Sequence, residues 1–203
     1  MKWTLMGVGV LVVLMAFAGC AKEPTAEITA VQQAIEQAKT AEAQEYAPRS
    51  LATANDAQAA LQAELDAQKK KFALFRSYKH AKELAAAAQT AAQQAVTDAA
   101  AGKERARQEA TDLMAQVRTA IEEARQMIAT APRGKGSSAD IKALENDLTS
   151  VEASLSEVDG VFQTGKYNQA KAKAQAALQS INRIKQDVTT AIEMQTKGRA
   201  AVK

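Results

Sequence analysis

The sequence predicts an all-α protein made of two tandem three-helix bundles, antiparallel and spectrin-like, that share a long central helix. Composition favours helices, because aromatic residues make up 4% of the chain and only three prolines and nine glycines occur in 203 residues. Apolar residues recur at three- and four-residue steps, the spacing of one buried helix face. One pattern of helices and turns also occurs twice, which indicates a duplicated structural unit.

The first predicted unit covers residues 26–101. Its first helix begins near Thr25 and ends before Pro48, because the residue before a proline avoids the helical region. Pro48 suits the first turn of a second helix, which closes on the basic run 69–71. A third helix begins at Tyr78 with a seam of alanines that lets neighbouring backbones approach closely. The three apolar stripes are Ile28, Val31, Ile35 and Ala38; Leu51, Ala54, Gln58, Leu61, Leu65, Gln68 and Phe72; and Ala81, Ala85, Ala88, Ala92 and Ala95.

The second predicted unit covers residues 102–196, and its segments match those of the first in the same order. Residues 31–39 match 117–125 class for class, and the Ala-Pro-Arg at 47–49 recurs at 131–133. We expect helix to continue through Gly102, because an isolated glycine costs a helix only about 1 kcal/mol.

The later helices of the second unit are separated by turn signals. Gly134 and Gly136 break the chain before a helix capped by Ser137 or Ser138, and Asp159-Gly160 and Thr164-Gly165 bracket the next turn. Residues 197–203 form a frayed tail. The stripes are Ala106, Ala110, Leu113, Val117, Ala120 and Ala124; Ile141, Leu144, Leu148, Val151, Leu155, Val158 and Phe162; and Tyr167, Ala170, Ala174, Ala177, Ile181, Ile184 and Val188.

The first nineteen residues have the features of a cleaved signal peptide. Lys2 precedes an uncharged apolar run, which is too short to cross a bilayer core of about 30 Å comfortably. The run ends in Ala18-Gly19-Cys20 and resembles the lipobox of bacterial lipoproteins, with Phe17 where that family usually has leucine. The alternative is a plain signal peptide whose cysteine falls at the cut by chance.

The lipobox resemblance implies cleavage of residues 1–19 between Gly19 and Cys20 and acylation of Cys20, which gives a membrane anchor. Residues 20–25 are then the lipidated cysteine and a short tether. Ala21 stands where an aspartate would favour inner-membrane retention, so the resemblance implies the periplasmic face of the outer membrane. Several acyl chains, at about 0.8 kcal/mol per buried methylene, make a stable anchor.

A second resemblance concerns the helical body. A Tyr/Ala-Pro start, a helix, a Gly-x-Tyr turn and an alanine-rich helix are similar to domain-of-unknown-function family 4398, which is helical and occurs in bacterial envelope lipoproteins. The first unit departs from it with Arg76-Ser77 at the expected turn glycine. The resemblance implies a location in the envelope and no known activity. It is carried by Tyr46, Ala47, Pro48, Leu51, Tyr78, Ala81 and Lys82, and by Gly165, Lys166, Tyr167, Ala170 and Ala174.

Candidates for catalysis or metal binding are few. His80 is the single histidine and Cys20 the single cysteine, so the sequence offers no histidine metal cage, Ser-His-Asp triad, disulfide or thiolate cluster. We therefore expect no enzyme, no metal and no cofactor. Glu122, Glu123, Asp140 and Glu145 fall at helix-surface spacing beside basic residues, and Met114, Met127 and Met194 are interpreted as core or edge filler.

One cluster favours a binding role. Basic residues gather at the later turn of the first unit with aromatic residues between them, a pattern that could contact anionic lipid headgroups, lipopolysaccharide phosphates or a protein. The alternative is that lysines at a helix end complement the helix dipole and keep the turn soluble. The cluster consists of Lys69, Lys70, Lys71, Arg76, Lys79, His80 and Lys82, with Phe72, Phe75 and Tyr78 interleaved.

These observations predict a lipid-tethered envelope protein with a structural or partner-binding role. A net charge of +3 gives no argument for nucleic acid as a partner. One rival is a chaperone or binding module, whose alanine seams could pair helices in a homo-oligomer. Another is a cell-wall hydrolase, which would need clustered carboxylates or a metal set that the pattern does not supply.

Overall fold

The computed structural model describes residues 22–131 and 138–200. These residues form helices and turns without a strand, which confirms the all-α prediction. The predicted central helix is α4, which runs 52 residues from Lys79 to Thr130. The chain divides into two compact units, one ending at Gly102 and the other beginning at Lys103, so α4 contributes its first part to unit 1 and its second part to unit 2.

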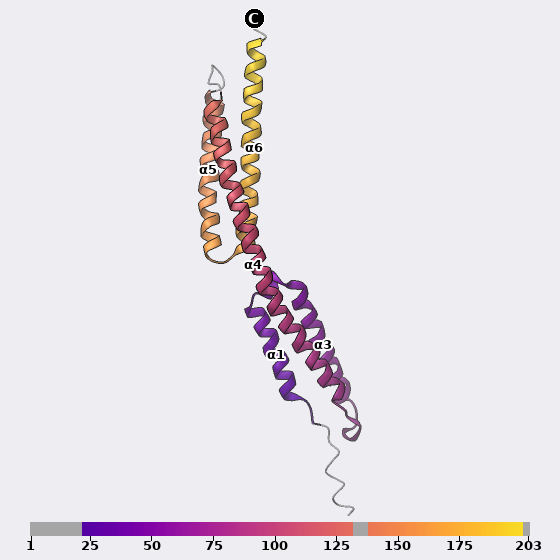
Figure 1. The fold of residues 1–203 in the computed structure, drawn as a ribbon. Helices are drawn as coiled ribbons and strands as arrows, with labels where there is room; N and C mark the ends of the chain where they lie inside the picture. The colour runs from indigo at the N-terminus through magenta and orange to yellow at the C-terminus, as the bar shows by residue number, and fades with distance from the viewer. Residues whose placement is uncertain (1–21, 132–137, 201–203) are drawn as a thin grey trace, which may run out of the picture. The chain divides into compact units, whose positions relative to one another are not determined.

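Unit 1 packs α1 (Thr25–Thr40), α2 (Ala43–Tyr46) and α3 (Pro48–Lys69) against the first part of α4 (Figure 1). Proline at the first position of α3 fits there because its missing N–H would have had no helical partner. The α4 face is almost purely alanine, which leaves room for the larger side chains of α1 and α3. Its buried alanines are Ala81, Ala85, Ala88, Ala92, Ala95 and Ala99.

The first helix of unit 1 is shorter than we predicted, because the chain breaks after Thr40. Glu42 takes a left-handed conformation with φ of 61°, and its N–H bonds the Lys39 carbonyl at 2.9 Å. The short α2 then follows in a new direction. This break allows both Ala43 and Tyr46 to be buried, which a continuous helix with one apolar stripe would not achieve.

Gly102 has a packing role that the sequence prediction did not include. Helix α4 continues through it, as predicted. A Cβ built on this glycine would overlap the carbonyl oxygen of Tyr46 and would lie 3.1 Å from the carbonyl carbon. The end of α2 therefore lies directly on the α4 backbone, and only glycine leaves space for that approach.

Unit 2 packs α5 (Ser138–Gln163) and α6 (Tyr167–Ala200) with the second part of α4. The predicted turn at Asp159-Gly160 is wrong, because α5 continues to Gln163 and the chain turns only at Thr164-Gly165, where Gly165 has φ of +77°. The predicted breaks at Gly134 and Gly136 and the Ser137 cap lie outside the described residues. Helix α6 extends to Ala200, beyond the start of the predicted fraying.

The core of unit 2 contains larger side chains than the alanine face that α4 contributes to unit 1. Leucine, isoleucine and valine from α5 and α6 meet the Val117–Ile128 part of α4 in one continuous cluster. This matches the sequence pattern, which fills the later stripes with branched residues. The fully buried large side chains of this unit are Val117, Val158, Ile181 and Val188.

Ion pairs connect the helices of each unit along their exposed faces. In unit 2, Arg118 pairs with Asp159 at 2.8 Å and Lys171 with Glu109 at 2.7 Å. In unit 1, Lys82 pairs with Glu27 at 3.1 Å. Lys82 and Lys171 are equivalent, because residues 78–82 (Tyr-Lys-His-Ala-Lys) recur as residues 167–171 (Tyr-Asn-Gln-Ala-Lys). Each lysine joins the last helix of its unit to the first. Exposed pairs of this kind are worth about 0–1 kcal/mol each, so they guide helix register more than they stabilise the fold.

Candidate functional site

The predicted lipidation and cleavage residues, Cys20 and Gly19, lie outside the described residues. The described chain begins at Lys22, and α1 begins at Thr25. The structure therefore gives geometry only for the second predicted site, the basic and aromatic cluster. That cluster lies where α3 ends, the short 3₁₀ helix η1 (Ala73–Phe75) follows and α4 begins. We call residues 70–78 the α3–α4 loop.

Two ion pairs bring the start of the described chain beside this loop. The Glu23 carboxylate lies 3.0 Å from the Lys69 ammonium, and the Glu27 carboxylate lies 3.1 Å from that of Lys82. The first turn of α1 consequently lies at the same end of unit 1 as the α3–α4 loop (Figure 1). The segment that leads back to Cys20 enters unit 1 at this end.

The two pairs also change the protonation equilibria of their members. Hydrogen bonds from its own backbone N–H and from the Lys82 ammonium lower the pKa of the Glu27 carboxyl. The hydrogen bond to the Glu23 carboxylate raises the pKa of Lys69. Lys69 and Lys82, both predicted as surface contacts, are thus already engaged with carboxylates of unit 1.

Glu27→Gln should reduce the stability of unit 1 at neutral pH but not in acid. Because folding lowers the Glu27 pKa, the stabilisation is complete above the ordinary carboxyl value, about pH 4.3, and disappears as pH falls through the folded value. We expect the difference in free energy of unfolding between the parent chain and the variant to shrink towards zero as the pH falls below about 4.3 and through the lowered pKa of Glu27. Urea unfolding at several pH values measures it.

Glu36→Gln provides the control for this experiment. Glu36 pairs with Lys39 on the same helix, so it does not join α1 to α4. At neutral pH, Glu36→Gln should therefore lower the free energy of unfolding by less than Glu27→Gln does. If the difference in free energy of unfolding between the parent chain and Glu27→Gln grew on acidification, the lowered pKa of Glu27 would be contradicted.

Polar bonds hold the α3–α4 loop in place. Gln68, the buried polar side chain at the end of α3, accepts a hydrogen bond from the Ser77 N–H at 3.0 Å. The Arg76 guanidinium donates to the carbonyls of Lys69 and Lys71, both at 3.0 Å. The bond to Lys69 satisfies the last carbonyl of α3, and the other two fix the loop that follows. Arg76, predicted as a surface contact, is in fact the cap of this helix end.

Apolar side chains on the loop point away from the core of unit 1. Phe72, Leu74 and Phe75 are 69%, 65% and 76% exposed, and the two phenylalanine rings lie 6.4 Å apart. The prediction that Phe72 belongs to the buried stripe of α3 is wrong, because α3 ends at Lys69. Tyr78 is buried at 6% exposure, so it does not belong to the exposed cluster. Sequence reasoning missed Leu74, although its place between two phenylalanines was a usable signal.

Three lysines complete the exposed surface of this end. Lys70, Lys71 and Lys79 are exposed, and no ion pair engages them among the described residues. The equivalent turn of unit 2 is different, because Phe162 is half-buried and packs on Tyr167 with ring centroids 5.1 Å apart. The combination of exposed apolar and basic side chains thus distinguishes the α3–α4 loop from the turn between α5 and α6.

The other candidate residues lie on helix surfaces. His80 is exposed beside Glu83 at 3.5 Å. Glu122 pairs with Arg125, and Glu123 with Lys185, while the Asp140 side chain lies outside what the structure describes. Met114 is buried as expected, but Met194 is 69% exposed and is not core filler. In residues 22–131 and 138–200, no three His, Cys, Asp or Glu side chains are grouped to hold a metal ion.

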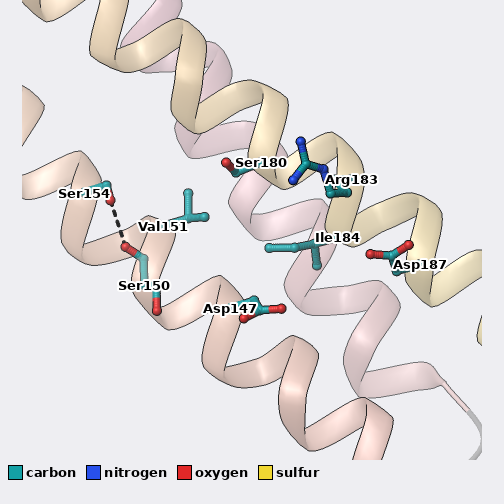
Figure 2. Close-up of a pocket in the computed structure, with 8 residues that line it drawn as sticks. All are labelled: Asp147, Ser150, Val151, Ser154, Ser180, Arg183, Ile184 and Asp187. Carbon is teal, nitrogen blue, oxygen red and sulfur yellow. Dashed lines mark hydrogen bonds between the residues drawn. The ribbon is translucent and has the colours of Figure 1, made fainter.

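A groove of about 360 Å³ lies between α5 and α6 (Figure 2). Figure 2 shows its two walls, with the Ser154 hydroxyl bonded to the Ser150 carbonyl on α5 and Arg183 and Asp187 on α6. Short serine side chains create this space. Its lining is mostly polar and holds no aromatic side chain, whereas small-ligand pockets are usually lined by apolar and aromatic side chains. The remaining lining residues are Asp147, Val151, Ser180 and Ile184.

None of the helices in the described part of the chain combines the length and apolarity needed to cross a membrane. Comparison of the chain with protein-family models, with curated proteins and with solved structures gives no match.

Proposed function

We propose that the chain is a lipid-anchored protein of the bacterial envelope, facing the periplasm from the outer membrane, with a structural or partner-binding role. The observation that carries this proposal is the apolar run ending in Ala18-Gly19-Cys20, which resembles a lipobox. A helical body follows closely, because α1 opens at Thr25. Five residues span at most about 17 Å, so an acylated Cys20 would keep unit 1 near the membrane surface.

The form of the body supports a scaffold. Each unit buries its apolar stripes in a helical core and presents polar helix faces crossed by exposed ion pairs. Long helices of this kind offer extended lateral surfaces to partner proteins. The proposal assigns no reaction to the chain, and it includes the resemblance to domain-of-unknown-function family 4398, which implies the same location.

Cys20→Ser tests the anchor. We expect the variant to lose radiolabelled palmitate completely and to leave the outer-membrane fraction, because the thiol that carries the diacylglycerol is gone. Fractionation of cells and palmitate labelling measure both effects. Ala21→Ser is the matched control and should keep label and location. Ala21→Asp should keep the label but favour the inner membrane. A Cys20→Ser chain that stays labelled in the outer membrane would overturn the proposal.

A second candidate function is a periplasmic chaperone or binding module. The exposed side chains of Phe72, Leu74 and Phe75 favour it, because an apolar surface can hold a partner protein. A photo-crosslinking residue at position 75 in intact cells distinguishes the two. One discrete protein adduct would favour the binding module, and the absence of protein adducts would favour the tethered scaffold.

A further inference from the structure

Apolar exposure is concentrated on the α3–α4 loop to an unusual degree. Four large apolar side chains are strongly exposed in the described chain, and three of them, Phe72, Leu74 and Phe75, lie within four consecutive positions. Single exposed apolar residues are normal on a protein surface, whereas a cluster of them marks a contact site. The loop therefore requires an explanation that the isolated Met194 does not.

These three side chains lie outside the buried core of unit 1. The loop is held by the Gln68 and Arg76 hydrogen bonds, and η1 by the bond from the Phe75 N–H to the Phe72 carbonyl at 2.9 Å. The aromatic rings contact each other outside the core cluster of unit 1. Polar bonds thus fix the backbone in a conformation that displays the apolar side chains.

The position of the loop indicates what it faces. Glu23 pairs with Lys69 at 3.0 Å, so the chain from Cys20 enters unit 1 beside the end of α3. Glu23 lies three residues after Cys20 in the sequence, which is a reach of about 10 Å. A bilayer that holds acyl chains on Cys20 would therefore lie against the same end of unit 1 as the exposed loop.

The charge of the surface and its place beside the tether favour lipid over a protein partner. Lys70, Lys71 and Lys79 flank the apolar side chains, and lysine can keep its ammonium at anionic headgroups while its stem lies along apolar surface. Three side chains of this size expose about 400 Å² at most. A stable protein interface buries about 800 Å² on each side, polar rim included, so area does not separate the two kinds of partner. The flanking lysines and the nearby tether are what favour lipid.

We propose that the α3–α4 loop is a membrane-interface wedge, in which Phe72, Leu74 and Phe75 enter the acyl-chain boundary of the bilayer that holds the Cys20 lipid. Lys70, Lys71 and Lys79 remain at the headgroups. This inference rests on the tether proposed above. It adds a second membrane contact, which would fix the orientation of unit 1 instead of leaving it to pivot on its tether.

A single introduced tryptophan tests the wedge in the full, processed chain. Trp3 is the only tryptophan in the sequence, and the expected cleavage before Cys20 removes it, so Phe75→Trp gives the processed chain a single tryptophan. The chain is reconstituted into vesicles of phosphatidylglycerol and phosphatidylcholine whose acyl chains carry bromine, a fluorescence quencher. We expect the emission from position 75 to shift to shorter wavelength and to be quenched relative to vesicles without bromine.

Thr53→Trp, also as the only tryptophan of the processed chain, is the matched control. Thr53 is exposed near the start of α3, away from the loop, and a tryptophan there should emit as in water and escape quenching. Lys70→Gln combined with Lys71→Gln should weaken the quenching at position 75. Unchanged quenching would overturn the headgroup role of these lysines.

Vesicle flotation separates failure of the wedge from failure of the tether. A chain that floats with the vesicles but shows no quenching at position 75 overturns the wedge and leaves the tether standing. A wavelength shift without quenching means that protein covers the loop, which also overturns the wedge. A chain that does not float overturns both.

Discussion

Leu148→Asp should lower the free energy of unfolding of unit 2 by about 3–5 kcal/mol, because it replaces a buried apolar side chain with a carboxylate that has no buried partner. Leu148 is 5% exposed and belongs to the continuous core cluster of α4, α5 and α6. It lies near the middle of α5, where fraying of the helix end cannot bring the charge to water. Urea unfolding followed by circular dichroism measures the change.

Asn146→Asp is the control for this substitution. Asn146 is exposed on the same helix, so the variant adds the same charge to α5 without placing it in the core. Surface changes of this kind alter stability by about 0.5 kcal/mol or less. We expect Leu148→Asp to separate the unfolding transitions of the two units, so that unit 2 unfolds at a lower urea concentration than unit 1. Equal stability of the two variants would contradict the bundle core described for unit 2.

Periodicity predicted the core well because helix packing depends mainly on which face is apolar. The stripe from Ile141 to Val158 is buried as expected, and so is the alanine seam of α4. Continuity of α4 through Gly102 was predictable as well, because one glycine costs a helix little. These features are local, or repeat along the chain, so a single sequence shows them.

Features that depend on contacts between distant segments were not predictable. The break at Glu42 precedes the close approach of Tyr46 to Gly102 on α4, a contact between segments far apart in the sequence. Asp159-Gly160 is a sequence typical of turns, but it lies inside α5, because the neighbouring Val158 and Val161 contribute to the core of unit 2.

The same limit applies to the candidate site. The basic cluster was visible in the sequence, but only the structure shows that carboxylates at the start of the chain engage Lys69 and Lys82. Likewise, Tyr78 is buried while Leu74 is exposed, although both occur in the same short stretch. The ion pairs and the exposure of these side chains depend on how α1 packs against α3 and α4. A short sequence pattern does not predict that packing.

Gly102→Ala should destabilise unit 1 by up to about 2 kcal/mol, although alanine is the better helix former. The new Cβ would overlap the Tyr46 carbonyl oxygen, a backbone atom that no rotamer change can move. Forcing such a contact apart costs about 1–3 kcal/mol, which exceeds the gain of about 1 kcal/mol from replacing glycine in a helix. Relief would require α2 to withdraw from α4 and to expose the buried Ala43.

Gly160→Ala supplies the matched comparison, because the two changes are chemically identical and both lie inside helices. A Cβ on Gly160 would meet nothing within 4 Å, so alanine there should stabilise unit 2 by about 0.5–1 kcal/mol. Urea unfolding of both variants should therefore give changes of opposite sign. If Gly102→Ala also stabilises the chain, α2 does not approach α4 closely, and the break at Glu42 loses its structural explanation. Changes of opposite sign would show that glycine stabilises unit 1 at position 102 because it allows the close approach of Tyr46.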